Sequence, residues 1–221
     1  MKNPSVLLLD LDGTLLSESK TGVRIDFIYK TLKRTHPYFG KMGSLRFYME
    51  CQKILGSYDG KLTNSERVLH NLSQKFQRSE KEILSGIEII EDYIFPTLDK
   101  YFKQIPEAQD FVKWASGKYR LVLATNPVWR LNPIHLRLLW AGLDPSYFEL
   151  ITHSEIMYSC KPRTTYYSQI LQLINTPAEN CLMIGNDKKM DGAAINAGIE
   201  TFILKNNKSY NELKTKLLRA I

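Results

Sequence analysis

The segment VLLLDLDGT, residues 6–14, places two carboxylates, Asp10 and Asp12, directly after a run of apolar residues. A short apolar run bounded by glycine is typical of a strand that is covered on both faces in a parallel sheet, and Asp10 stands where this strand would end. Two neighbouring carboxylates repel each other and are costly to remove from water unless a cation or a reacting group lies between them. The segment therefore predicts a site for chemistry at the end of the first strand.

Further polar residues follow the later predicted strands or stand at helix starts that would face the same crevice. They are Thr125, Asn126, Lys161, Asn186, Asp187 and Asp191. Ligand sites of open α/β sheets lie at the carboxyl ends of the strands. We therefore expect these side chains to meet Asp10 and Asp12 at one edge of a sheet.

The elements that must position these residues are strands that alternate with helices in the second half of the chain. Apolar runs predict strands over residues 6–9, 120–125, 148–152, 181–185 and 200–204. Helical patterns separate them over residues 107–117, 163–175 and 191–198. Such alternation is typical of an α/β fold with a doubly wound parallel sheet.

Residues 17–103 differ, because β-rich runs disappear and amphipathic helical windows follow one another. Apolar residues recur at spacings of three and four over residues 24–35, 44–55, 65–76 and 80–95. Two of the predicted helix starts carry a capping box, Thr63 with Glu66 and Ser79 with Glu82. The sequence therefore predicts an all-helical insertion after the first strand.

In their order and strand context, the motifs resemble those of the haloacid dehalogenase superfamily of hydrolases, and the resemblance covers nearly the whole chain. The motifs are Asp10-Leu11-Asp12-Gly13-Thr14, Thr125-Asn126, Lys161-Pro162, and Gly185-Asn186-Asp187 followed by Asp191. The helical insertion resembles the helical cap of that family. The resemblance implies a Rossmann-like core domain, residues 1–16 and 104–221, and an all-helical cap domain, residues 17–103.

The residue types in these motifs suit the phosphoryl transfer that the resemblance implies. Asp10 would attack a phosphoryl group and hold it as an aspartyl phosphate, which splits one displacement into two easier ones. Asp12 would give a proton to the leaving oxygen and later take one from water. Thr125, Asn126 and Lys161 would bind the phosphate, with Thr125 donating its hydroxyl and Lys161 supplying a fixed positive charge.

A carboxylate that attacks a phosphate dianion needs a cation nearby, and Mg²⁺ prefers oxygen ligands. The resemblance implies a Mg²⁺ ion bound by Asp10, by the backbone carbonyl of Asp12 and by Asp187. Asn186 departs from the family pattern, because many members place an aspartate directly after the glycine. We expect Asn186 and Asp191 to lie just behind the metal ligands, with Asp191 orienting Lys161 or a metal-bound water.

The function that this pattern favours is that of a Mg²⁺-dependent phosphatase, which cleaves small phosphomonoesters. A carboxylate at the position of Asp12 is shared by the phosphatases and phosphomutases of the family, whereas its haloalkanoate dehalogenases differ there. Two alternatives stay open. One is a sugar phosphomutase of the same fold, and the other is a non-enzymatic module that binds a phosphorylated ligand or nucleic acid.

Composition sets wider bounds on partners and location. The chain has 221 residues, a formal net charge of +7 and three widely spaced cysteines without the pairing of a zinc site. The charge suits an anionic partner, but basic residues are scattered among acids, so we expect a small phosphorylated metabolite rather than nucleic acid. No run reaches the length of a membrane span, and the opening run lacks a signal-peptide cleavage site. We expect a cytoplasmic protein with reduced thiols, and the sequence specifies neither its substrate nor its oligomeric state.

Overall fold

Five parallel strands form the central sheet of the computed structural model, which describes residues 3–58 and 60–220. The strands are β1 (Val6–Leu9), β4 (Arg120–Leu123), β5 (Leu150–Ile151), β6 (Cys181–Gly185) and β7 (Glu200–Ile203). They lie in the order β5-β4-β1-β6-β7. All five strands predicted from apolar runs are confirmed, although β5 is shorter than the predicted residues 148–152.

The strand order changes direction at β1, which lies in the middle of the sheet. Leu9 pairs with Leu123 of β4 on one side and with Ile184 of β6 on the other. The chain first adds β4 and β5 on one side of β1 and then crosses to add β6 and β7 on the other. Such a switch point opens a crevice at the carboxyl ends of the strands, which is where ligands bind in open α/β sheets.

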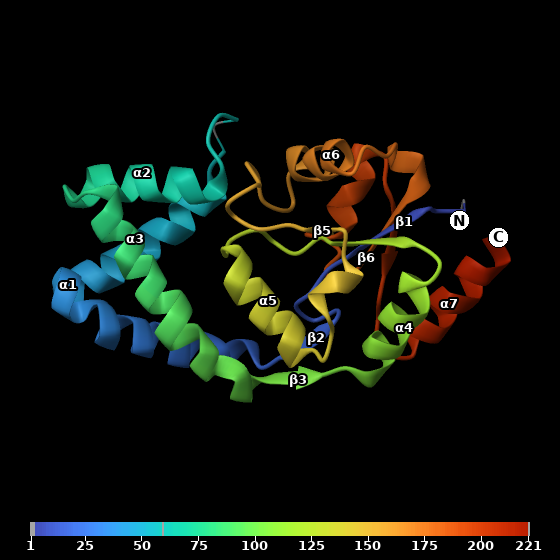
Figure 1. The fold of residues 1–221 in the computed structure, drawn as a ribbon, viewed down its shortest axis with the longest axis horizontal. Coiled ribbons are helices and arrows are strands. Elements are labelled where there is room, and N and C mark those ends of the chain that lie inside the picture. The colour runs from blue at the N-terminus through green and yellow to red at the C-terminus, as the bar shows by residue number, and fades with distance from the viewer. Residues whose placement is uncertain (1–2, 59, 221) are drawn as a thin grey trace.

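Helices cover both faces of the sheet, as a doubly wound fold requires (Figure 1). Leu7 and Leu9 belong to a buried cluster with residues of α4 (Pro106–Ser116), α5 (Leu131–Trp140) and α7 (Ser209–Ala220). Leu8 belongs to a second cluster, with residues of α6 (Thr164–Leu173) and of the 3₁₀ segment η5 (Gly192–Ala197). Because successive side chains of a strand point to opposite faces, every residue of β1 is buried. Two short 3₁₀ turns complete the core, η3 (Pro145–Tyr147) and η4 (Ala178–Asn180).

The insertion after the first strand is helical, as predicted, and it stands beside the sheet at the left of Figure 1. It comprises α1 (Lys20–Gly56), α2 (Asn64–Phe76), α3 (Glu80–Ile89), the π-helix η1 (Ile90–Ile94) and the 3₁₀ segment η2 (Phe95–Tyr101). Both capping boxes are present at the starts of α2 and α3. The predicted windows 24–35 and 44–55 are not separate helices, because α1 continues through the residues between them. Phe47, Leu72 and Ile83 belong to the separate buried cluster of this unit.

A short antiparallel ribbon of two strands connects the helical unit to the core. Its strands are β2 (Leu16–Glu18) and β3 (Phe102–Gln104), and Leu16 pairs with Gln104. Three-residue strands carry too little pattern for a sequence prediction, so the ribbon was not anticipated. The division into residues 1–16 with 104–221 and residues 17–103 stays a prediction, and the ribbon crosses both of its boundaries. Among the described residues, no helix combines the length and apolar character that crossing a membrane requires.

Candidate active site

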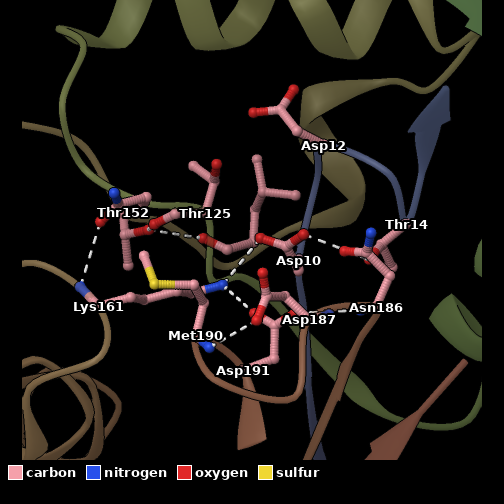
Figure 2. Close-up of polar contacts among 12 residues, drawn as sticks. Asp10, Asp12, Thr14, Thr125, Thr152, Lys161, Asn186, Asp187, Met190 and Asp191 are labelled. Carbon is pink, nitrogen blue, oxygen red and sulfur yellow. Dashed lines mark hydrogen bonds and ion pairs between the residues drawn. The ribbon is translucent and has the colours of Figure 1, made fainter. Parts of the chain in front are cut away.

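Asp10 follows the last residue of β1, at the carboxyl edge of the sheet. Its backbone N–H donates to the carbonyl of Ile184 at 2.9 Å, so the sheet hydrogen bonding fixes its position. Its side chain is buried, with the residue 8% exposed. One carboxylate oxygen accepts a hydrogen bond from Lys161 Nζ at 2.8 Å and the other from Thr14 Oγ1 at 3.2 Å (Figure 2). Both oxygens therefore face charged or polar partners within the crevice.

Lys161 stands between two carboxylates. Its Nζ atom donates to Asp10 at 2.8 Å and to Asp191 at 2.6 Å, and the backbone N–H of Lys161 donates to Asn126 Oδ1 at 3.1 Å. Burial alone would lower the pKa of Lys161, but the charges of Asp10 and Asp191 raise it, so the ammonium group is protonated. Burial raises the pKa of Asp10 to about 6, although Lys161 opposes this shift. One cation thus faces two buried carboxylates, which leaves the site short of positive charge.

Asp191 organises the loop that follows β6. Its Oδ2 atom accepts the backbone N–H groups of Asn186 and Asp187, both at 3.0 Å, while Oδ1 accepts from Lys161. A Cβ atom on Gly185 would lie 2.1 Å from Asp191 Oδ2, so only glycine leaves room for this carboxylate. Asp191 is 1% exposed. It joins Lys161 to the loop, a contact in keeping with the expectation that it orients Lys161.

The side chains of Asn186 and Asp187 have different hydrogen-bond partners. Asn186 Oδ1 accepts a hydrogen bond from Thr14 Oγ1 at 3.2 Å, and its amide lies against Gly13, whose φ of +81° suits glycine. Asp187 is exposed, and its Oδ1 atom accepts backbone N–H groups of its own loop, from Lys189 at 2.7 Å and from Met190 at 2.9 Å. These bonds lower the pKa of Asp187. The side chain of Asn186 therefore contacts the segment that follows Asp10, whereas the carboxylate of Asp187 is held by its own loop.

Thr125 is held in place by its backbone carbonyl. This oxygen accepts hydrogen bonds from Thr152 Oγ1 at 2.8 Å and from Tyr166 Oη at 2.7 Å. All three residues are buried. The loop that begins at Thr125 and Asn126 is thus anchored by Thr152, which follows β5, and by Tyr166 of α6, and Asn126 connects it to Lys161.

Asp12 faces a partner that the sequence analysis did not identify. Its carboxylate points away from that of Asp10 (Figure 2) and forms an ion pair with Arg137 of α5. The sequence analysis predicted no helix over residues 131–140, so Arg137 had no place in the expected site. One signal was available. Arg137 stands three residues after Ile134 and four before Ala141, on a helix face that is otherwise apolar.

The carboxyl edge of the sheet therefore brings together most of the predicted residues. Asp10, Lys161 and Asp191 are joined by direct contacts, Asn126 contacts Lys161, and Asn186 contacts Thr14 beside Asp10. Within the described part of the chain, no three His, Cys, Asp or Glu side chains gather as a preformed metal cluster. A cation here would have to combine carboxylate oxygens with carbonyl or amide oxygens, a donor set that suits a hard ion such as Mg²⁺. The roles assigned to the individual residues stay predictions.

Comparison with solved structures finds chains of the same fold over almost their full length. A 2-haloacid dehalogenase from Pseudomonas syringae pv. Tomato DC3000 is 17% identical, with a TM-score of 0.64, covering 96% of this chain and 99% of that chain. A HAD phosphatase from Thermococcus onnurineus is 18% identical, with a TM-score of 0.61 and 98% of each chain covered. A HAD family enzyme from Bacteroides thetaiotaomicron, in complex with magnesium and inorganic phosphate, is 18% identical, with a TM-score of 0.56, covering 95% of this chain and 98% of that chain.

At these identities the structural likeness establishes the fold alone. No curated protein matches the chain at a significant level. A family model described as haloacid dehalogenase-like hydrolase matches residues 4–198, which is most of the chain. Together with the strand order and the motifs at the carboxyl edge of the sheet, this match shows that the chain belongs to the haloacid dehalogenase-like hydrolases.

Proposed function

We propose that this hydrolase is a Mg²⁺-dependent phosphatase that cleaves small phosphomonoesters through an aspartyl phosphate on Asp10. The observation that carries the proposal is the pairing of Asp10 with Lys161 at the end of β1, with the carboxylate of Asp12 standing apart from that of Asp10. A buried carboxylate with a fixed cation beside it is suited to nucleophilic attack on a phosphoryl group. The substrate we propose is a small phosphorylated metabolite rather than nucleic acid.

Asp12 favours phosphoryl transfer over dehalogenation. An alcohol leaves a phosphomonoester as a strong base and benefits from a proton, whereas a halide leaves without one. The side chain of Asp12 is 31% exposed at the carboxyl edge of the sheet. A general acid at this place would have no task in displacing a halide.

The residues of the crevice fit the magnesium ion that the family implies. We propose that Asp10, the backbone carbonyl of Asp12 and Asp187 hold it, and the position of Asn186 beside Thr14 makes its amide oxygen a further candidate ligand. The ion would offset the repulsion between the nucleophile and the phosphoryl oxygens. The enzyme from Bacteroides thetaiotaomicron that was solved with magnesium and inorganic phosphate supports this choice.

The protein residues supply the remaining steps. A carboxylate oxygen of Asp10 forms a bond to phosphorus while the bond from phosphorus to the leaving oxygen breaks, and Asp12 protonates that oxygen. Lys161, Thr125 and Asn126 hold the phosphoryl oxygens. Water then attacks phosphorus and gives a proton to Asp12, and the bond between phosphorus and Asp10 breaks. Inorganic phosphate leaves, and Asp10 is restored.

Phosphate release from a panel of phosphomonoesters tests the proposal. We expect release from 4-nitrophenyl phosphate in Mg²⁺, loss of release in EDTA, and recovery when Mg²⁺ is added in excess. Full activity in EDTA would argue against the metal. If label moved from a phosphorylated sugar to a second sugar without release of phosphate, the protein would be a phosphomutase.

Nucleic-acid binding has its own test, since such binding must weaken steeply as salt increases. A filter-binding assay at low and high salt would reveal it. We also propose a cytoplasmic location, which is supported by three cysteines that are all free: Cys51, Cys160 and Cys181.

A further inference from the structure

We propose that Arg137 is a positioning residue that holds the carboxylate of Asp12 in one orientation for its proton transfers. The inference rests on the proposed function, because it assigns a partner to the general acid of that reaction. It starts from the contact between Arg137 Nη1 and Asp12 Oδ2. The two residues are 125 positions apart in the sequence, so only the packing of α5 against the crevice brings them together.

Arg137 is buried although it has few partners. The residue is 4% exposed, and among the described residues no acceptor lies within hydrogen-bond reach of its Nε and Nη2 atoms. Its guanidinium carbon lies 5.9 Å from the ring centroid of Phe95 in η2, a distance at which the charge and the ring attract each other. Burying an arginine with a single ion pair is costly, and an apolar residue of similar length would pack there at lower cost. The cost points to a role for the contact with Asp12.

The two carboxylate oxygens of Asp12 have different surroundings. Oδ2 binds Arg137, while Oδ1 is buried and has no hydrogen-bond partner among the described residues. An isolated aspartate can occupy several staggered side-chain rotamers. The ion pair with Arg137 selects one of them, and it leaves Oδ1 without a protein partner that would compete for its proton.

The selected orientation matches the geometry of phosphoryl transfer. The attacking and leaving oxygens lie roughly in line on opposite sides of phosphorus. A general acid must therefore stand away from the nucleophile, with a phosphoryl group between them. Figure 2 shows the carboxylate of Asp12 standing apart from that of Asp10, as a general acid on the leaving-group side would.

The dependence of the rate on the leaving group tests this role. Phenyl phosphate needs a proton for its departing oxygen, whereas 2,4-dinitrophenyl phosphate releases a stable phenolate and needs one much less. A general acid contributes about 100- to 10,000-fold, and a misplacement of about 1 Å can cost about 100-fold. We expect Arg137→Met to lower kcat/KM for phenyl phosphate by about 30- to 100-fold, and kcat/KM for 2,4-dinitrophenyl phosphate by less than about threefold. The ratio kcat/KM is the quantity to compare, because it reports the steps up to departure of the leaving group and not the later attack by water.

A double-mutant cycle shows whether Arg137 acts through Asp12. In kcat/KM, Asp12→Asn should show the same dependence on the leaving group, and adding Arg137→Met to it should cause no further loss on phenyl phosphate. The matched control is Arg120→Met, which removes an arginine paired with Glu149 at the opposite end of β4 and should leave the ratio of the two rates unchanged. Equal losses on both substrates, or additive losses in the double variant, would overturn the inference.

A conservative variant covers the case in which Arg137→Met does not fold. Arg137→Lys keeps the charge but lacks the planar guanidinium, so we expect a loss of about tenfold on phenyl phosphate alone. Equal losses on both substrates in this variant would also overturn the role of Arg137. If the wild-type protein hydrolysed neither substrate, the proposed function itself would fail. Hydrolysis of both substrates with equal losses in the Arg137 variants would overturn only the role of Arg137.

Discussion

Asp10 keeps its carboxylate in a buried position where the ammonium group of Lys161 also serves Asp191. Burial raises the pKa of Asp10 to about 6, and the charge of Asp191 adds to this shift. Above that pH the ionised form of Asp10 lowers the stability of the folded protein relative to the unfolded chain. Destabilising charges are common at functional sites, so the role of Asp10 can be tested by measuring stability as well as activity.

Asp10→Asn should therefore lose hydrolysis without losing stability. In EDTA at pH 7.5 we expect the variant to unfold at the same temperature as the wild type or at a higher one, because asparagine stays uncharged. Its free energy of unfolding should be larger than that of the wild type by up to about 1 kcal/mol. Excess Mg²⁺ should reverse the order, since an ion that binds only the folded state stabilises the wild type more than a variant that lacks one ligand. Melting curves of both proteins decide the matter. A variant clearly less stable in EDTA, with a wild type indifferent to Mg²⁺, would mean that Asp10 is a structural acid.

Lys161→Ala tests the fixed charge beside the nucleophile. Removing an electrostatic group that acts on the developing charge costs about 100- to 1,000-fold in turnover, so we expect a loss of that size in kcat on 4-nitrophenyl phosphate. Lys189→Ala is the control, because Lys189 is an exposed lysine of the loop after β6 and should retain nearly full activity. A loss below tenfold in Lys161→Ala would demote Lys161 to a structural role.

At the scale of secondary-structure elements, the sequence predicted the strands and helices that have a strong apolar or capping pattern. Five apolar runs gave the five strands, and the pairs Thr63 with Glu66 and Ser79 with Glu82 marked the starts of α2 and α3. The ribbon of β2 and β3 was missed because its strands have three residues each. The helix α5 was missed too, and Arg137 with it, although the apolar spacing around Arg137 is a local signal for a helix. The contact of Arg137 with Asp12 depends on tertiary packing that no local pattern encodes.

The π-helix η1 carries a buried acid that the sequence analysis did not consider. Glu91 is 7% exposed and accepts from the backbone N–H and from Nη1 of Arg130, both at 3.4 Å. Burial raises the pKa of Glu91 to about 7, although Arg130 opposes this shift. The contact joins the helical insertion to the loop between β4 and α5.

Glu91→Gln should change the pH dependence of stability. Between about pH 5 and pH 7 the folded wild type holds a proton on Glu91 that the unfolded chain has released, so raising the pH removes a stabilising contribution. The free energy of unfolding of the wild type relative to Glu91→Gln should therefore fall by about 1–3 kcal/mol between pH 5 and pH 8. Urea unfolding at several pH values measures it. Glu179→Gln, at an exposed position of η4, should show no such slope. A difference between wild type and Glu91→Gln that is independent of pH would contradict the assignment.

At the scale of the whole molecule, the order of the motifs carried the most information. Strand ends of a parallel sheet meet at one edge, so the sequence could predict that Asp10, Lys161 and Asp191 would lie together, and they do. It could not predict how the loop after β6 turns. The structure ties the carboxylate of Asp187 to its own loop and brings the amide of Asn186 to Thr14, and such choices depend on side-chain contacts rather than on spacing.

The covalent intermediate on Asp10 is the central claim, and acid quenching followed by mass spectrometry measures it directly. The Asp12→Asn variant with 2,4-dinitrophenyl phosphate and Mg²⁺ is suited to this, because the first step needs little acid whereas the second has lost its base. We predict a mass increase of one phosphoryl group, located on Asp10, removed by hydroxylamine and absent when Asp10→Asn is added. Rapid hydrolysis by the Asp10→Asn variant, or a phosphoryl group on a residue other than Asp10, would contradict the account.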